Sequence, residues 1–287
     1  MRNRSKNFPA FLFLILVSLG IACINQEAFV SPAGYDLNSP TKYSMSEGLL
    51  EISGIDFYHG RPDSIYAEQD EDGRIYYLKL GDKKPSYARF GPHGDYEDIA
   101  IMGEQVFVLR SDGVLFSFPF KQVRSNDIRD VRKLEGIVPA GEYEALYADE
   151  KGQKLYMLCK SSKGEKNTKL SKGFILQTAS SGAIKATGTF GINVKEIEAL
   201  SGKGKISFRP SAFAKNSKTN EWYILSSVNK MLVTTDTNWT VKAVYALDPS
   251  VFIQPEGIAF DNKNNLYISN EGNELSAGTI LKFSYRN

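Results

Sequence analysis

Three glutamates recur at the starts of short apolar segments, and their spacing could bring them together. Glu97, Glu144 and Glu256 begin three of five related segments, and the other two begin with Ser53 and Ser211. The five segments start 44, 47, 67 and 45 residues apart. If they are equivalent strands around one axis, the carboxylates converge. Their repulsion and lost solvation are relieved when a cation lies between them.

Calcium is the cation that these side chains favour, because it accepts about six to eight carboxylate, amide, carbonyl and water oxygens. Glu51 lies two residues before Ser53 and so points to the same strand face. Gln69 and Asn270 offer amide oxygens at equivalent positions on the following strands. The sequence therefore predicts a calcium site formed by Glu97, Glu144, Glu256, Glu51 and Asn270.

The glutamates also have alternatives to a shared calcium ion, and the other polar motifs are weaker candidates for a functional site. The glutamates could instead be solvated separately or pair with Arg110 and Arg209. The two histidines, His59 and His93, stand beside glycine and proline in expected turns, which favours surface positions over a catalytic base. Residues 261–265 alternate oxygen donors but lack the glycine and distant glutamate of a calcium loop, so we interpret them as a turn.

The five segments belong to a longer repeat. Each is followed by a turn and a second strand with an aromatic residue near its start, as in Trp222-Tyr-Ile and Leu266-Tyr-Ile. A third strand follows, and several units show a fourth, as at residues 241–247. About four strands in about 45 residues is the size of one propeller blade.

The repeat predicts an all-β chain that forms a five-bladed β-propeller, because strands rich in Tyr, Val, Ile and Phe alternate with polar turns. The last unit lacks its outer strand, and residues 42–47 could supply it and close the ring. No sustained helical period is present outside the N-terminus. The 67-residue interval leaves a six-bladed ring as the alternative; an insertion at residues 160–173, expected to be a solvated loop, costs less.

The N-terminus has the organisation of a bacterial lipoprotein signal peptide. A basic start is followed by an apolar stretch and by small residues before Cys23. We predict a signal peptide at residues 1–22, acylation of Cys23, a flexible tether at residues 23–41 and the propeller at residues 42–287. The protein would then be anchored outside the cytoplasm in the plasma or outer membrane. The other cysteine, Cys159, lies in an apolar run and is expected to be buried.

The charge of the chain argues against nucleic acid as a partner. The full chain has 35 basic and 33 acidic side chains. Arg2, Arg4 and Lys6 leave with the predicted signal peptide, so the mature chain is close to neutral. A nucleic-acid-binding domain would need clustered positive charge.

Several segments together resemble the SdiA-regulated family of bacterial β-propellers. They include Leu-Glu-Ile-Ser-Gly-Ile at residues 50–55, Phe-Arg-Pro-Ser-Ala-Phe at 208–213 and Gln-Pro-Glu-Gly-Ile-Ala-Phe-Asp at 254–261. The resemblance extends from about Tyr43 to Phe283. It implies five blades, a distant relation to NHL-repeat propellers and a calcium site, and it implies no substrate. Gln69 and Asp98 depart from the family pattern, where Asn and a small residue are expected.

Two classes of function fit these predictions. As a binding module, the propeller would use calcium structurally and hold a glycan, peptide or protein at one face. As an enzyme, it would resemble calcium-dependent lactonases of six-bladed propellers, in which the ion polarises a carbonyl. We take the binding module as the first hypothesis and the lactonase- or esterase-like hydrolase as the alternative.

Overall fold

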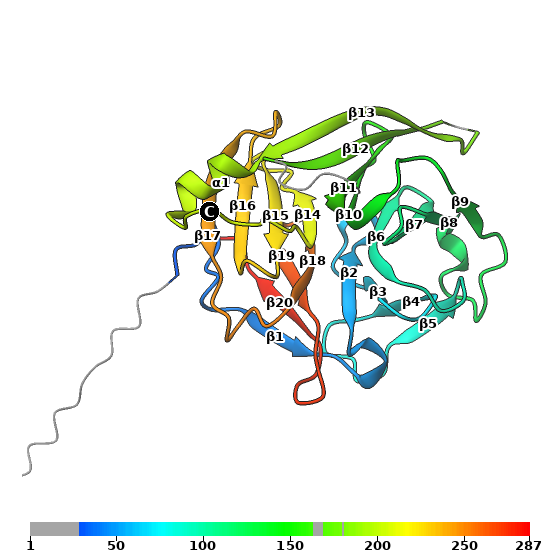
Figure 1. The fold of residues 1–287 in the computed structure, drawn as a ribbon. Helices are drawn as coiled ribbons and strands as arrows, with labels where there is room; N and C mark the ends of the chain where they lie inside the picture. Colours follow the sequence, from blue (N-terminus) through cyan, green and yellow to red (C-terminus); the bar gives the residue numbers. More distant parts are fainter. Residues whose placement is uncertain (1–28, 163–168, 180) are drawn as a thin grey trace, which may run out of the picture.

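Twenty strands form five four-stranded antiparallel sheets in the computed structural model, which describes residues 29–162, 169–179 and 181–287. The sheets surround a central axis as the blades of a propeller (Figure 1). This confirms the predicted five-bladed β-propeller in preference to six blades. The predicted signal peptide and Cys23 lie outside the described residues.

Each blade runs in chain order from its inner to its outer strand, and the last blade borrows β1. Blade 1 contains β2 (Ile52–Asp56), β3 (Ile65–Gln69), β4 (Arg74–Leu78) and β5 (Ser86–Arg89). Blade 2 contains β6 (Tyr96–Met102), β7 (Gln105–Arg110), β8 (Leu115–Pro119) and β9 (Arg132–Leu134). Blade 3 contains β10 (Gly141–Asp149), β11 (Lys154–Ser162), β12 (Leu170–Thr178) and β13 (Ile184–Asn193). Blade 4 contains β14 (Ala212–Lys215), β15 (Trp222–Ser226), β16 (Met231–Thr235) and β17 (Val241–Ala246). Blade 5 contains β18 (Pro255–Phe260), β19 (Leu266–Asn270), β20 (Thr279–Phe283) and β1 (Thr41–Ser44).

The ring closes through pairing between the two ends of the described chain. β1 runs antiparallel to β20, with Tyr43 opposite Ile280. This confirms that an N-terminal strand completes the last blade. Because the outer strand and the inner strands of blade 5 come from opposite ends of the chain, the ring cannot open without breaking this ladder.

Neighbouring blades are held together by buried aromatic side chains. Between blades 1 and 2, the ring of Phe90 lies 5.0 Å from that of Tyr96 and 5.4 Å from that of Phe118. Near the axis, a side chain at Gly54 would clash with Asp98, and one at Gly257 would clash with the backbone of blade 1. Glycine at these two positions therefore lets the inner strands approach closely.

The sequence predicted a loop insertion in the third blade, but the structure has long strands there. Its four strands are 9 or 10 residues long, and β12 and β13 form an extended hairpin (Figure 1). Lys160, assigned to a solvated loop from the sequence, belongs to β11. The long interval also contains α1 (Val194–Ser201), whose first turn is capped by the Asn193 side chain. The expectation of no helix outside the N-terminus was therefore wrong.

The segment before β1 packs onto the propeller. Tyr35 and Leu37 are buried in the core of blades 4 and 5. The Tyr35 hydroxyl donates to the Asn264 carbonyl at 2.7 Å and accepts from the Asn216 amide at 3.0 Å. The described part of the predicted tether is thus folded, because one aromatic residue anchors it between two blades.

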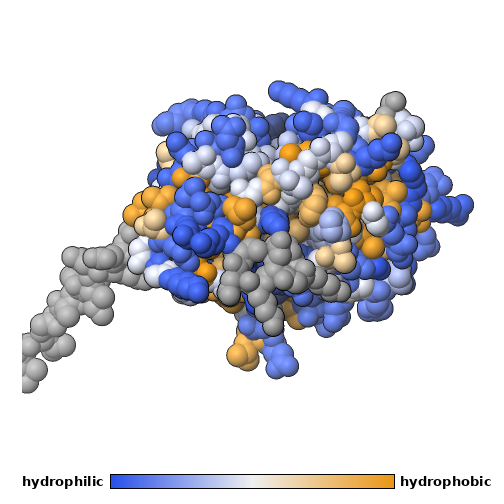
Figure 2. All heavy atoms as spheres, turned by 45° about the horizontal axis from the view of Figure 1, so that its top comes forward, coloured by the Kyte–Doolittle hydropathy of each residue, from blue (hydrophilic) through white to orange (hydrophobic). Residues whose placement is uncertain are grey.

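The surface in the view of Figure 2 is mainly hydrophilic, and apolar side chains are exposed in separate groups. The most exposed large apolar residues, Val30, Val228 and Leu275, lie outside strands. No helix within the described ranges is long and apolar enough to cross a membrane.

Candidate functional site

The five inner strands place their first residues around one end of the central channel. We call this the glutamate end, because Glu97, Glu144 and Glu256 lie near the starts of β6, β10 and β18. The second strand of each blade returns to the same end, so its last residues join the group. We call the opposite end, where the inner strands finish, the cavity end.

The three predicted glutamates share one electrostatic environment. Burial raises the pKa of Glu97 to about 10, and Glu144 and Asp95 add to the rise. Burial also raises the pKa of Glu256 to about 7, with Ser227 lowering it and Glu144 raising it. The glutamates therefore interact with one another, as the strand spacing predicted.

A lysine supplies part of the positive charge at this end. Lys160 Nζ lies 2.7 Å from Glu144 Oε1, and the Glu144 side chain is buried. Burial raises the pKa of Glu144 to about 7, although Lys160 lowers it. Arg110, an alternative partner considered from the sequence, pairs with Asp112 instead at 2.7 Å. The blade 3 side of the glutamate end is thus partly neutralised by the protein itself.

The side formed by blades 1 and 5 has carboxylates that sequence reasoning missed. Asp70 and Glu271 directly follow Gln69 and Asn270, which occupy equivalent register positions opposite Ile52 and Pro255. Burial raises the pKa of Asp70 to about 7, and Glu51 and Glu271 add to the rise. Burial raises the pKa of Glu271 to about 7, and Glu256 and Glu51 contribute. The end of each second strand was the sequence signal that could have revealed them.

Three buried oxygens on this side have no hydrogen-bond partner among the described residues. They are Glu68 Oε2, Asp70 Oδ1 and Asn270 Oδ1. By contrast, Gln69 Oε1 accepts from the Glu71 backbone N–H at 3.0 Å and is already occupied. Unpartnered buried acceptors are costly, so an arrangement with several of them suits a cation that would coordinate them.

The serines of the predicted ring have a different role. The Ser53 hydroxyl donates to the Glu97 carbonyl at 2.9 Å, and the Ser211 hydroxyl donates to the Pro255 carbonyl at 2.7 Å. Both bonds join one inner strand to the next. These serines therefore fasten neighbouring blades and leave the glutamates as the charged members of the ring.

Two aspartates make similar bonds. Asp98 accepts from the backbone N–H groups of Ile99 and Leu146, at 2.8 and 2.7 Å. This gives the unexpected residue at position 98 a structural role, since it ties blade 2 to blade 3. Asp56 accepts from the Phe57 and Ile101 N–H groups, both at 2.7 Å, and ties blade 1 to blade 2.

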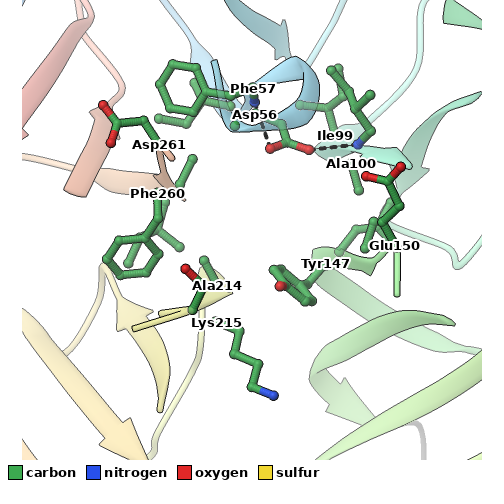
Figure 3. Close-up of a pocket in the computed structure, with 18 of the residues that line it drawn as sticks. Asp56, Phe57, Ile99, Ala100, Tyr147, Glu150, Ala214, Lys215, Phe260 and Asp261 are labelled. Carbon is green, nitrogen blue, oxygen red and sulfur yellow. Dashed lines mark hydrogen bonds between the residues drawn. The ribbon is translucent and has the colours of Figure 1, made fainter. Parts of the chain in front are cut away.

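A cavity of about 230 Å³ opens at the cavity end and is lined by all five inner strands. Figure 3 shows Asp56, Tyr147, Glu150, Lys215 and Phe260 around its opening. None of these residues was predicted as part of a site.

Within the part of the chain that the structure describes, no three His, Cys, Asp or Glu side chains are close enough to hold a metal together.

Comparisons with known proteins agree with this architecture. A family model described as SdiA-regulated matches residues 51–275. No curated protein sequence matches the chain. Among solved structures, glutaminyl cyclase from Myxococcus xanthus has 15% identity and a TM-score of 0.55, covering 86% of this chain and 96% of that one. A regucalcin from Agrobacterium tumefaciens, described as a calcium-binding protein, has 14% identity and a TM-score of 0.51, covering 88% and 95%. At such identities the likeness establishes the propeller fold alone.

Proposed function

Because the chain belongs to the SdiA-regulated family of β-propellers, we propose that it is a calcium-binding interaction module anchored outside the cytoplasm of a bacterium. The observation that carries the calcium proposal is that Asp70 Oδ1 and Asn270 Oδ1, at the glutamate end, are buried and have no hydrogen-bond partner among the described residues. The solved structure of the calcium-binding regucalcin, which shares the propeller fold, supports it.

Calcium fits the blade 1 and blade 5 side better than the blade 3 side. Glu144 already has Lys160 as its partner, and burial raises the pKa of Glu97 to about 10, so Glu97 holds its proton more firmly than the other carboxyl groups. We therefore place the ion among the carboxylates and amide oxygen opposite them: Glu51, Asp70, Glu256, Asn270 and Glu271. Because no three of these carboxylates lie close enough to hold a metal as they stand in the described structure, binding would draw their side chains together. Calcium accepts such mixed oxygen donors. It would pin the first blade to the last, because these residues come from β18, from the ends of β3 and β19 and from the residue before β2.

Calcium titration of the chelator-treated protein tests this site. We expect Asp70→Asn and Glu256→Gln each to weaken calcium binding at least tenfold in isothermal titration calorimetry, because each removes a charged ligand. Asp63→Asn is the matched control, since Asp63 is an exposed carboxylate, and it should bind as the wild type does. Wild-type affinity in both site variants would refute the proposed ligands.

The glutamate end is also the face that we propose for a partner. Val228 follows β15 and Leu275 lies between β19 and β20, so both exposed apolar side chains stand on loops at this end. A peptide or protein could bury both apolar side chains on binding, so we favour it over a glycan as the ligand.

The folded N-terminal segment indicates which end of the propeller would face the membrane. Tyr35 contacts the turns after β14 and β18, through Asn216 and Asn264, and these turns lie at the cavity end. Residues 23–28 can span at most about 20 Å when fully extended. If Cys23 is acylated, the cavity end is close to the membrane and the glutamate end faces away from it.

Replacing the proposed lipid-bearing residue tests the anchor. We expect Cys23→Ser to move the protein from the membrane fraction to the soluble fraction and to abolish incorporation of labelled fatty acid. Cys159→Ser changes the other cysteine of the chain, which is buried, and should leave the protein in the membrane fraction. Unchanged membrane partition of Cys23→Ser would contradict anchoring at this residue.

A further inference from the structure

The cavity at the cavity end is separate from the proposed calcium site and large enough for a small organic molecule. Its volume is about 230 Å³, whereas a cavity of about 150 Å³ with apolar walls admits benzene. Ile99, Ala100 and Ala214 form apolar parts of the wall, and the rings of Tyr147 and Phe260 stand beside them (Figure 3). The wall therefore offers contacts to a hydrocarbon group.

One carboxylate of this wall has acceptor capacity left. Each Asp56 oxygen accepts one backbone N–H, from Phe57 or Ile101, and a carboxylate oxygen can accept a second hydrogen bond. No ion pair joins Asp56 to a basic side chain of the described residues. Asp98 also lines the cavity, and burial raises its pKa well above the usual range, with Asp56 adding to the rise. Burial raises the pKa of Asp56 to about 7, so a bound cation would favour its ionised form. The inner wall thus offers carboxyl oxygens that no basic side chain of the described residues neutralises.

The basic side chains near the opening do not contact Asp56. Lys215 Nζ lies over the Trp222 ring, 5.8 Å from its centroid, and Figure 3 shows it across the opening from Asp56 and pointing away. His59 Nδ1 is 3.4 Å from Glu150 Oε2, so these two groups face each other at the rim. The Asp56 carboxyl group is therefore available to a ligand.

We propose that this cavity binds a small organic cation, an ammonium or guanidinium compound with a short apolar chain, whose charged group contacts Asp56. Its apolar part would lie against Tyr147 and Phe260, and aromatic rings also attract cations. A metal ion fits less well, because calcium needs about six to eight oxygen ligands and much of this wall is hydrocarbon. An anion would be repelled by Asp56 in its ionised form.

Binding of three probes of similar shape tests this inference. Phenethylammonium, the neutral 2-phenylethanol and the anionic 3-phenylpropanoate would be titrated into the calcium-loaded protein and followed by calorimetry or ligand-observed NMR. We expect the ammonium compound to bind at least tenfold more tightly than the alcohol, and the anion to bind most weakly. Equal affinities of the ammonium compound and the alcohol would overturn the proposal.

Variants of the wall identify the site. Asp56→Asn should remove the preference for the ammonium compound, and Asp63→Asn, which changes an exposed carboxylate, should retain it. Because Asp56 also joins two blades, Ala214→Leu provides a second test by filling the cavity, and it should abolish binding of the ammonium compound. Wild-type binding by Ala214→Leu would refute the location. Calcium titration of the same variants reports on the other end of the channel, so failure of one proposal is distinguishable from failure of the other.

Discussion

Replacing Tyr35 with alanine is expected to lower the free energy of unfolding by about 3–5 kcal/mol, the range for large-to-small changes of buried aromatic residues. The Tyr35 ring lies 5.3 Å from that of Tyr285 and 6.2 Å from those of Tyr223 and Phe260. Removing it leaves a cavity where blade 4, blade 5 and the C-terminus meet. Urea-induced unfolding, followed by circular dichroism, measures the loss.

A smaller change at the same position separates the ring from its hydroxyl. Tyr35→Phe keeps the ring but leaves the buried Asn216 and Asn264 amides without their shared partner, which costs about 1–3 kcal/mol. Val30→Ala, at an exposed residue of the same segment, should change stability by less than about 0.5 kcal/mol. A loss below about 1 kcal/mol for Tyr35→Ala would mean that this segment contributes little to the fold.

The contacts of Tyr35 are an example of structure that the sequence does not predict. The blades could be predicted, because each is a run of adjacent antiparallel strands and the repeat is local. Tyr35 contacts residues 181 and 229 positions away, in a polar segment without periodicity. Nothing within that segment indicates such partners, so it was expected to be a tether.

The glutamate end was predictable in part for the same reason. Equivalent positions on the first strands could be aligned, and the glutamates do share one environment. The partner of Glu144 could not be foreseen, because Lys160 lies in a stretch whose Ser, Gly and Asn content suggested a loop. In the structure the long strands of blade 3 extend through the start of this stretch and turn the lysine toward the channel. Asp70 and Glu271 were not predicted because they lie one residue beyond the ends of β3 and β19, outside the aligned strand positions.

The chelator-treated protein is expected to lose stability as the pH rises from about 5 to about 8.5. Burial and neighbouring carboxylates raise the pKa of Asp70, Glu256 and Glu271 to about 7, whereas unfolded carboxyl groups titrate near about 4. The folded state therefore binds more protons than the unfolded state between these values. The stabilising contribution of these groups is fully present below pH ~4 and is lost as the pH rises through about 7. A net shift of one pKa unit in each of two groups corresponds to about 3 kcal/mol.

Calcium should reverse this trend. An ion that binds the deprotonated carboxylates only in the folded state stabilises the protein by about 4 kcal/mol at 1,000 times its Kd, and this increment grows as the carboxylates lose their protons. For a chain of this size, that corresponds to roughly 8–16 °C in melting temperature. Thermal melts at pH 5, 7 and 8.5, with calcium and with chelator, measure both trends. Asp70→Asn should flatten the chelator series and reduce the calcium increment, because it removes one titrating ligand. If stability in chelator rose with pH, or if calcium had the same effect at pH 5 and pH 8.5, the buried carboxylates of the glutamate end would not be the groups that bind the ion.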